Sequence, residues 1–260
     1  GKLFMDTITK SNAELIPIDS EHNAIFQCIT NASNKKSSTI RSIMLTASGG
    51  PFLNTPIEEL SSKTPEQACK HPKWKMGRKI SVDSATMMNK GLEIIEASWL
   101  FNIDPDAINV VIHPQSIIHS LVEYKDGSVL AQLGNPDMRV PISFGLAWPE
   151  RIETDVERLN LFDVAQFDFK KPEMDRFPCL RFAREAIKQG GTCSAILNAA
   201  NEVAVNEFLN KKIMFTDIAR IIESVMSDVT QNDADSIEKI LKDDELARKR
   251  AIEIIRDMNT

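Results

Sequence analysis

The run Asp83-Ser-Ala-Thr-Met-Met-Asn-Lys-Gly-Leu-Glu93 constrains this chain more than any other stretch. Asp83 and Ser84 are residue types that cap helix N-termini, where free backbone amides and the positive end of the dipole also attract anions. Asn89 precedes Glu93 by four residues and Lys90 precedes it by three. A helix therefore brings an amide, an ammonium and a carboxylate onto adjoining faces. For Lys90 and Glu93, an ordinary surface ion pair is the alternative.

Two earlier stretches carry related chemistry. Asp19 and Glu21 follow an apolar stretch, Leu15–Ile18, that we expect to be a strand. Residues two apart in an extended chain point to the same side, so both carboxylates can reach one hard cation. Ser48-Gly49-Gly50 follows a second strand signal, and its backbone amides can form an anion-binding nest. Solvated acids and a plain turn are the respective alternatives.

The pattern of apolar residues predicts an α/β (α+β) catalytic domain with a mostly parallel or mixed sheet, followed by a C-terminal α-helical bundle. Expected domains are residues 1–147 for metal and substrate binding, a connecting segment 148–173, and a helical domain 174–260. Expected strands are residues 15–18, 43–45, 109–113, 116–123 and 129–133, and expected helices are 64–68, 85–101, 179–189, 193–209, 216–229, 236–241 and 244–258.

Composition limits the classes of partner. A formal net charge of −6 with no basic stripe argues against nucleic acid, and no apolar run reaches membrane-spanning length. The four cysteines, Cys28, Cys69, Cys179 and Cys193, include no C-x-x-C pair, so we expect free thiols in a reducing compartment.

Seven motifs together resemble the 1-deoxy-D-xylulose 5-phosphate reductoisomerase family. In family order they are Asp19–Phe26, Ser48–Phe52, His71–Gly77, Ser81–Glu93, His113–Ser116, Pro136–Met138 and Leu197–Glu202. The resemblance implies an enzyme that rearranges a phosphorylated ketose and reduces it with NADPH, giving 2-C-methyl-D-erythritol 4-phosphate in the non-mevalonate isoprenoid pathway. It also implies a homodimer that binds phosphonate inhibitors.

The resemblance implies roles for individual residues. Asp19, Glu21 and Glu93 would hold Mg²⁺ or Mn²⁺ and, with Lys90, form the catalytic set. Residues implied to bind the substrate are Ser20, Glu21, Ser48, His71, Trp74, Ser84, Asn89, Lys90 and Glu93, while Gly77 would contact the cofactor. Trp74 would lie over the substrate in a loop from Ser48 to Arg78, although a buried core position is the plain alternative for a tryptophan. Mutual repulsion of the three carboxylates would raise at least one pKa without metal.

The family also opens with a dinucleotide-binding domain, and the ten glycines of this chain give no G-x-G-x-x-G fingerprint. We therefore expect the catalytic and C-terminal parts of the reductoisomerase, separated from the cofactor domain and inactive alone. The alternatives are a metal-dependent phosphosugar isomerase or lyase without a redox step, and a non-catalytic assembly partner. The expected location is cytoplasmic, of the bacterial type, or plastid if a targeting segment was removed.

Overall fold

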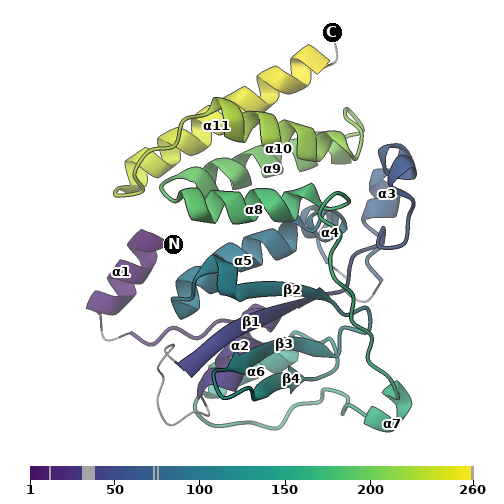
Figure 1. Cartoon of the computed structure of the whole chain (residues 1–260), viewed down its shortest axis with the longest axis vertical. Coiled ribbons are helices and arrows are strands. Elements are labelled where there is room, and N and C mark those ends of the chain that lie inside the picture. Colours follow the sequence, from purple (N-terminus) through teal and green to yellow (C-terminus); the bar gives the residue numbers. More distant parts are fainter. Residues whose placement is uncertain (12, 31–38, 73, 75, 259–260) are drawn as a thin grey trace. The chain divides into compact units, whose positions relative to one another are not determined.

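The computed structural model describes residues 1–11, 13–30, 39–72, 74 and 76–258 (Figure 1). The chain divides into two compact units. One, the sheet unit, comprises residues 7–48 and 97–172; the other, the helical unit, comprises residues 1–6, 49–96 and 173–260. Lys73 and Lys75, from the expected substrate loop, lie outside the described residues.

The sheet unit is built on a mixed four-stranded sheet of order β2-β1-β3-β4. Its elements are α2 (Ser20–Thr30), β1 (Ile40–Ala47), the 3-10 helix η3 (Pro105–Ala107), β2 (Ile108–Ile112), β3 (Ile118–Tyr124), β4 (Val129–Leu133), α6 (Arg139–Ala147) and α7 (Leu161–Val164). β1 pairs in parallel with β2 and antiparallel with β3, and β3 pairs antiparallel with β4. The mixed sheet and four of the five expected strands are thereby confirmed.

The remaining expected strand, Leu15–Ile18, is wrong. These residues have no regular secondary structure and lead directly into α2. An apolar tetrapeptide containing Pro17 lacks one backbone donor for a sheet ladder. Instead, the Pro17 carbonyl accepts a hydrogen bond from the buried side chain of Asn23 in α2 (2.8 Å), so the segment packs as the lead-in to a helix.

The core of the sheet unit lies between the sheet and α2, which packs against β3 and β4. Ile25 of α2 and Ile43, Leu45 and Val122 of the sheet are fully buried. β1 is buried along nearly its whole length because it is a central strand with neighbours on both sides. This packing fixes α2, and with α2 the position of its acidic first turn.

The helical unit contains the 3-10 helix η2 (Ile57–Ser62), α3 (Pro65–Ala68), α4 (Arg78–Ala85), most of α5 (Met88–Phe101), α8 (Pro178–Gln189), α9 (Cys193–Leu209), α10 (Asp217–Asp228) and α11 (Ile237–Met258). α1 (Lys2–Lys10) and α5 each begin in the helical unit and end in the sheet unit. The apolar residues that recur at helical spacing in α10, including Ile218 and Ile222, are buried against the other helices.

The helical unit differs from the sequence expectation in two places. The expected helix 85–101 begins only at Met88, as α5, because Met87 adopts a left-handed backbone (φ 61°); Ala85 is the last residue of α4, a helix that the sequence did not predict. The expected helices 236–241 and 244–258 are the single helix α11. Asp243, inside α11, is buried and accepts hydrogen bonds from Thr192 (2.5 Å) and Asn232 (3.0 Å), so it is a tertiary anchor and not a helix stop.

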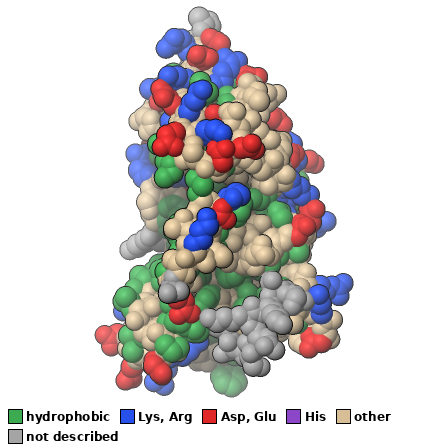
Figure 2. All heavy atoms as spheres, turned by 90° about the vertical axis from the view of Figure 1, so that its left-hand side faces the viewer, with side chains coloured by type: hydrophobic (Ala, Val, Ile, Leu, Met, Phe, Trp, Pro, Cys, Tyr) green, Lys and Arg blue, Asp and Glu red, His purple; other side chains and the backbone are tan. Residues whose placement is uncertain are grey.

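Acidic and basic side chains alternate on the surface of the C-terminal helices. Figure 2 shows them interspersed on the visible face, and pairs such as Arg250–Asp228 (2.8 Å) and Arg248–Glu202 (2.6 Å) join neighbouring helices. No helix among the described residues is long and apolar enough to cross a membrane.

The domain boundaries expected from the sequence, at residues 147 and 174, stay a prediction.

Gly91 marks the closest approach of α5 to α8. A Cβ on Gly91 would lie 2.6 Å from the Cβ of Ala183 and 3.4 Å from the Cys179 carbonyl oxygen. Real Cβ atoms do not approach a rigid methyl group so closely, so the two helices can meet here only because residue 91 has no side chain.

We therefore expect Gly91→Ala to destabilise the chain. Overpacking costs about 1–3 kcal/mol, whereas alanine favours a helix over glycine by about 1 kcal/mol, so the net loss in urea unfolding should be at most about 2 kcal/mol. Ala183→Gly should partly rescue Gly91→Ala, giving a favourable coupling in a double-mutant cycle. Ala186→Gly, one turn further along α8, is the control and should combine additively; strict additivity for both pairs would refute the contact.

Candidate active site

The first turn of α2 presents two carboxylates in the sheet unit. Asp19 immediately precedes the helix, and its Oδ1 accepts hydrogen bonds from the backbone N–H groups of Glu21 (3.1 Å) and His22 (3.2 Å), which makes it the N-cap. Ser20 donates to Glu21 Oε2 (2.6 Å). The expected extended geometry for Asp19 and Glu21 is therefore wrong: a helix start orients them.

His22 was missed by the sequence analysis. It is fully buried, its Nδ1 lies 2.7 Å from Asp19 Oδ1, and its ring stacks on Phe101 at 6.3 Å between centroids. The imidazole therefore holds the Asp19 carboxylate in one orientation. A histidine three residues after an acidic N-cap faces that cap across one turn, and this spacing was the available signal.

Glu93 lies on α5 in the helical unit, buried together with Lys90. Its carboxylate accepts a hydrogen bond from Asn89 Nδ2 (2.6 Å) and one from the Lys90 ammonium. The side chains of Lys90 and Glu93 are each only 5% exposed. The sequence alternative of an ordinary surface pair is thus wrong, because solvent does not screen this pair.

The α4–α5 junction carries Ser84, which is half-buried, and Asp83, which is buried. Both lie in the last turns of α4, so the expectation that they cap a helix N-terminus is wrong. Asp83 accepts hydrogen bonds from Lys79 (2.7 Å) and from Asn201 of α9 (2.9 Å). Burial raises the pKa of the Asp83 carboxyl, and the Lys79 ammonium opposes that rise.

Asn201 is a second residue whose role the sequence did not reveal. It is fully buried, and its amide nitrogen ties α9 to α4 through Asp83. α9 has three asparagines, and Asn201 is the one that is buried; its neighbours Ala199, Ala200 and Ala204 were the signal, because a buried amide in a helix interior needs a specific partner.

The turn after β1 approaches the same junction. Gly49 and Gly50 both have positive φ (86° and 67°), and a Cβ on Gly50 would lie 2.7 Å from the Ser84 carbonyl oxygen. Only glycine permits this conformation together with this approach. The preceding Ser48 ends the sheet unit, and the anion-binding nest expected there stays a prediction.

His71 and Trp74 form a local turn in the helical unit. The Trp74 backbone N–H donates to His71 Nδ1 (2.9 Å). Trp74 is half-buried, so it is not a core residue, and Gly77 is exposed immediately before α4. Burial lowers the pKa of the His71 imidazole, and since Nδ1 accepts, the neutral ring carries its proton on Nε2.

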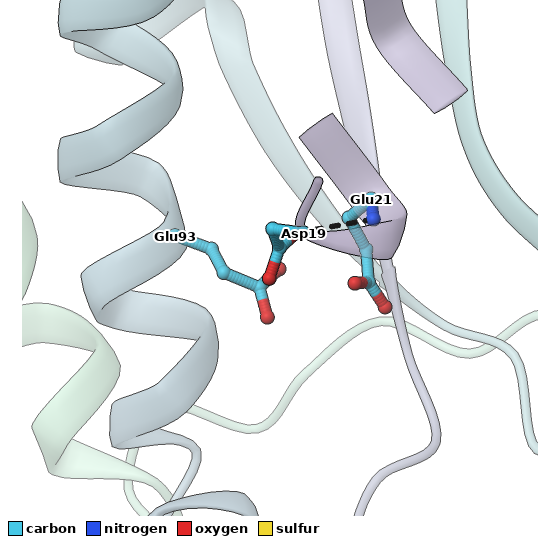
Figure 3. A group of neighbouring side chains, drawn as sticks. All are labelled: Asp19, Glu21 and Glu93. Atoms are coloured by element: carbon cyan, nitrogen blue, oxygen red, sulfur yellow. Dashed lines mark hydrogen bonds between the residues drawn. The ribbon is translucent and has the colours of Figure 1, made fainter. Parts of the chain in front are cut away.

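The expected site residues thus form two groups, each held by its own unit. Asp19, Ser20, Glu21 and Ser48 belong to the sheet unit, and His71, Trp74, Gly77, Ser84, Asn89, Lys90 and Glu93 belong to the helical unit. Figure 3 draws the three acids, with Asp19 and Glu21 at the start of α2 and Glu93 on α5. Taken together, the two groups contain hydroxyl, amide and ammonium donors, which suit phosphate, and carboxylate acceptors, which suit a hard cation.

Family models match most of the chain. Residues 15–101 match the model described as 1-deoxy-D-xylulose 5-phosphate reductoisomerase C-terminal domain, and residues 133–250 match the model described as DXP reductoisomerase C-terminal domain.

Curated relatives align along nearly the whole chain. The 1-deoxy-D-xylulose 5-phosphate reductoisomerase of Methylococcus capsulatus is 57% identical over 260 residues, which is 99% of this chain and 66% of that protein. The enzyme of Pseudomonas paraeruginosa is 58% identical over 253 residues, 96% of this chain and 64% of that protein. The chain therefore spans a little under two thirds of the length of these relatives.

Solved structures share the fold. The Zymomonas mobilis reductoisomerase in complex with NADPH superposes with a TM-score of 0.91 at 49% identity, covering 98% of this chain and 65% of that one. A crystal structure of DOX-P reductoisomerase in complex with NADPH, fosmidomycin and magnesium gives a TM-score of 0.93 at 46% identity, covering 99% and 67%.

A mixed sheet with an acidic helix start, joined to a helical unit, is the architecture of the catalytic and C-terminal regions of a sugar-phosphate reductoisomerase. The chain belongs to the 1-deoxy-D-xylulose 5-phosphate reductoisomerase family.

We predict that His71 titrates below the value of about 6.5 that is usual for histidine. A depressed folded-state pKa contributes stability above pH 6.5, and that stability is lost as the pH falls through the folded pKa. NMR titration should show a histidine midpoint below about 6.5, and His71→Gln should remove it. The variant should also lose less stability than the parent between pH 7.5 and 5.5. A His71 midpoint at or above about 6.5 would contradict the expected effect of burial on this imidazole.

Proposed function

We propose that this chain supplies the catalytic and C-terminal regions of an enzyme that converts 1-deoxy-D-xylulose 5-phosphate to 2-C-methyl-D-erythritol 4-phosphate with NADPH. The observation that carries the proposal is the 57% identity to the M. capsulatus reductoisomerase along 99% of the chain. A bacterial-type, cytoplasmic location is part of the proposal and is supported by the bacterial origin of the relatives.

The proposal assigns Asp19, Glu21 and Glu93 to a divalent cation, Mg²⁺ or Mn²⁺. Three carboxylates form an oxygen donor set that suits a hard ion, and a related structure contains magnesium. When bound, the cation would supply Lewis-acid polarisation of the ketone and neighbouring hydroxyl oxygens of the substrate. His22 would prepare this site by fixing the Asp19 carboxylate, and Ser20, which donates to Glu21, would contact the substrate.

Lys90 would stabilise negative charge on the substrate. Its ammonium has three N–H donors, so it can bind Glu93 and still donate to a substrate oxygen on which negative charge develops. Because the side chain is buried, such a hydrogen bond is stronger than it would be in water.

The phosphate would bind to Ser48, Ser84, Asn89 and Lys90, with His71 donating through Nε2–H. Asn89 uses one amide hydrogen on Glu93 and has a second for the phosphate. Each hydrogen bond to a charged group contributes about 1.5–3 kcal/mol, so several of them align the reacting end of the substrate from a distance. Trp74, half-buried beside His71, is proposed to cover the substrate, and Gly77 to contact the cofactor.

The metal assignment predicts a metal-dependent stability. At a concentration 100 times its Kd, Mn²⁺ should stabilise the chain by about 2.7 kcal/mol. Glu93→Gln should abolish that gain, and should also lower the metal-free stability by about 3 kcal/mol because it leaves the buried Lys90 ammonium without its counter-charge. The exposed Glu96, one turn along α5, gives the control Glu96→Gln, which should keep the full Mn²⁺ effect. A complete Mn²⁺ effect in Glu93→Gln would remove Glu93 from the site.

The activity itself is tested by completing the enzyme. These 260 residues contain no G-x-G-x-x-G fingerprint, so alone they should bind NADPH with a Kd well above the micromolar range. A Kd of about 1 μM corresponds to a binding free energy of about 8 kcal/mol. Joined to the part of the M. capsulatus relative that the chain does not match, they should oxidise NADPH when substrate and Mn²⁺ are present. Micromolar NADPH binding by the chain alone, or an inactive folded hybrid that binds NADPH, would contradict the proposal.

We further propose a homodimer and phosphonate binding, as the family resemblance implies. Fosmidomycin is bound in two related structures. For the dimer, the support is β4, an edge strand whose Val129, Leu130 and Leu133 are 47%, 44% and 37% exposed. An apolar strand edge of this kind is a template for pairing with another chain.

We expect Leu130→Lys to shift the chain toward monomer in sedimentation velocity. The control is Leu246→Lys on α11, where the side chain is equally exposed (44%) but outside the sheet. A parent chain that sediments as a monomer at all concentrations tested would end the dimer proposal.

A further inference from the structure

The helical unit contains a cavity of about 220 Å³ that none of the residues in the proposed metal and phosphate sites lines. It lies among η2, α8, α10 and the α4–α5 junction. Most of its wall is apolar and is formed by Ile57, Leu60, Pro178, Phe182, Phe215 and Ala219. The Phe215 ring is held by edge contacts with Phe52 and Phe208, so this part of the wall is rigid.

One charged side chain in this wall has an unused donor. Arg176 is only 11% exposed, and its Nη1 donates to the Thr55 carbonyl oxygen. Its Nε is buried and has no hydrogen-bond partner among the described residues. The Glu173 carboxylate lies 3.5 Å from Arg176 Nε, beyond good hydrogen-bond distance, and is 63% exposed. Buried donors are almost always satisfied, so this one indicates a missing acceptor.

Asp175, which also lines the cavity, is exposed to solvent. The remaining charged groups of the wall already have partners. Arg220 pairs with Asp217 (3.2 Å) and is 68% exposed, and Glu223 pairs with Arg181 (3.0 Å). Burial raises the pKa of the Cys179 thiol to about 12, which keeps it neutral. The cavity therefore combines an apolar interior with a single buried cationic donor.

We propose that this cavity binds a small organic anion with an apolar body, such as an aromatic carboxylate. Its carboxylate would accept the hydrogen bond of Arg176 Nε, and its ring would lie among Leu60, Phe182 and Phe215. The cavity is smaller than the range of about 300–1,000 Å³ usual for drug-sized ligands, so it fits a molecule of about one ring.

The cavity also lies next to the turn that precedes α5. Thr86 also lines it, and the Thr86 hydroxyl oxygen accepts a hydrogen bond from the backbone N–H of Met88, the first residue of α5 (3.3 Å). A ligand in the cavity therefore contacts the residue that caps the helix carrying Asn89, Lys90 and Glu93.

The test compares benzoate with benzyl alcohol, which has the same ring and no charge, by NMR titration of the isoleucine methyl groups of the whole chain. Benzoate should shift the Ile57 methyl saturably and bind at least about tenfold more tightly than benzyl alcohol. Arg176→Gln should reduce benzoate affinity to that of benzyl alcohol and leave benzyl alcohol binding unchanged. Arg220→Gln, which removes the same charge from the same wall, should change benzoate affinity by less than about twofold.

A second variant fills the space without touching the charge. Ala219→Met should weaken both ligands while the thermal melt shows a folded chain. Equal affinity for benzoate and benzyl alcohol, equal effects of the two arginine variants, or no saturable shift at Ile57 would each overturn the proposal; the last result would mean that ordered water alone satisfies Arg176.

Discussion

The contact between Gly91 and Ala183 is the constraint on which the candidate site residues of the helical unit depend. Because a Cβ at residue 91 would lie 2.6 Å from the Ala183 Cβ, that face of α5 must press against α8. Residues two positions away on either side lie about 200° around the helix. Asn89 and Glu93 are therefore directed away from α8 by the same contact that packs the helix, and the hydrogen bond between Asp83 and Asn201 fixes the junction before it.

The carboxylates of the site are held by donors from their own helices. Asp19 is bound by two helix amides and by His22, and Glu93 by Asn89 and Lys90. If Asp19, Glu21 and Glu93 share one cation, as we propose, these donors would offset part of the mutual repulsion that the sequence predicts. Because Asp19 and Glu93 also make these intramolecular interactions, neutralising either acid changes the free energy of unfolding as well as the chemistry.

Local periodicity was sufficient to predict much of the fold. β4 and α9 have the bounds expected from the sequence, because alternating or helically spaced apolar residues are enough to define them. The residue types of the candidate site were also visible in short motifs. Tertiary interactions decided the rest: Met87 takes a left-handed conformation that sequence periodicity does not signal, and Asp243, at the break expected between two helices, is buried inside α11 and binds Thr192 and Asn232.

The order of segments along the chain has a consequence for synthesis. The helical unit is assembled from three separate stretches, and the apolar side chains of Val82, Ala85 and Met88 pack against helices that begin only at residue 178. At about 5–20 residues per second, a ribosome needs about 4–18 seconds to add residues 173–260. During that interval the α4–α5 segment has no core to enter, so the nascent chain exposes the apolar side chains of this helix pair, as chaperone clients do.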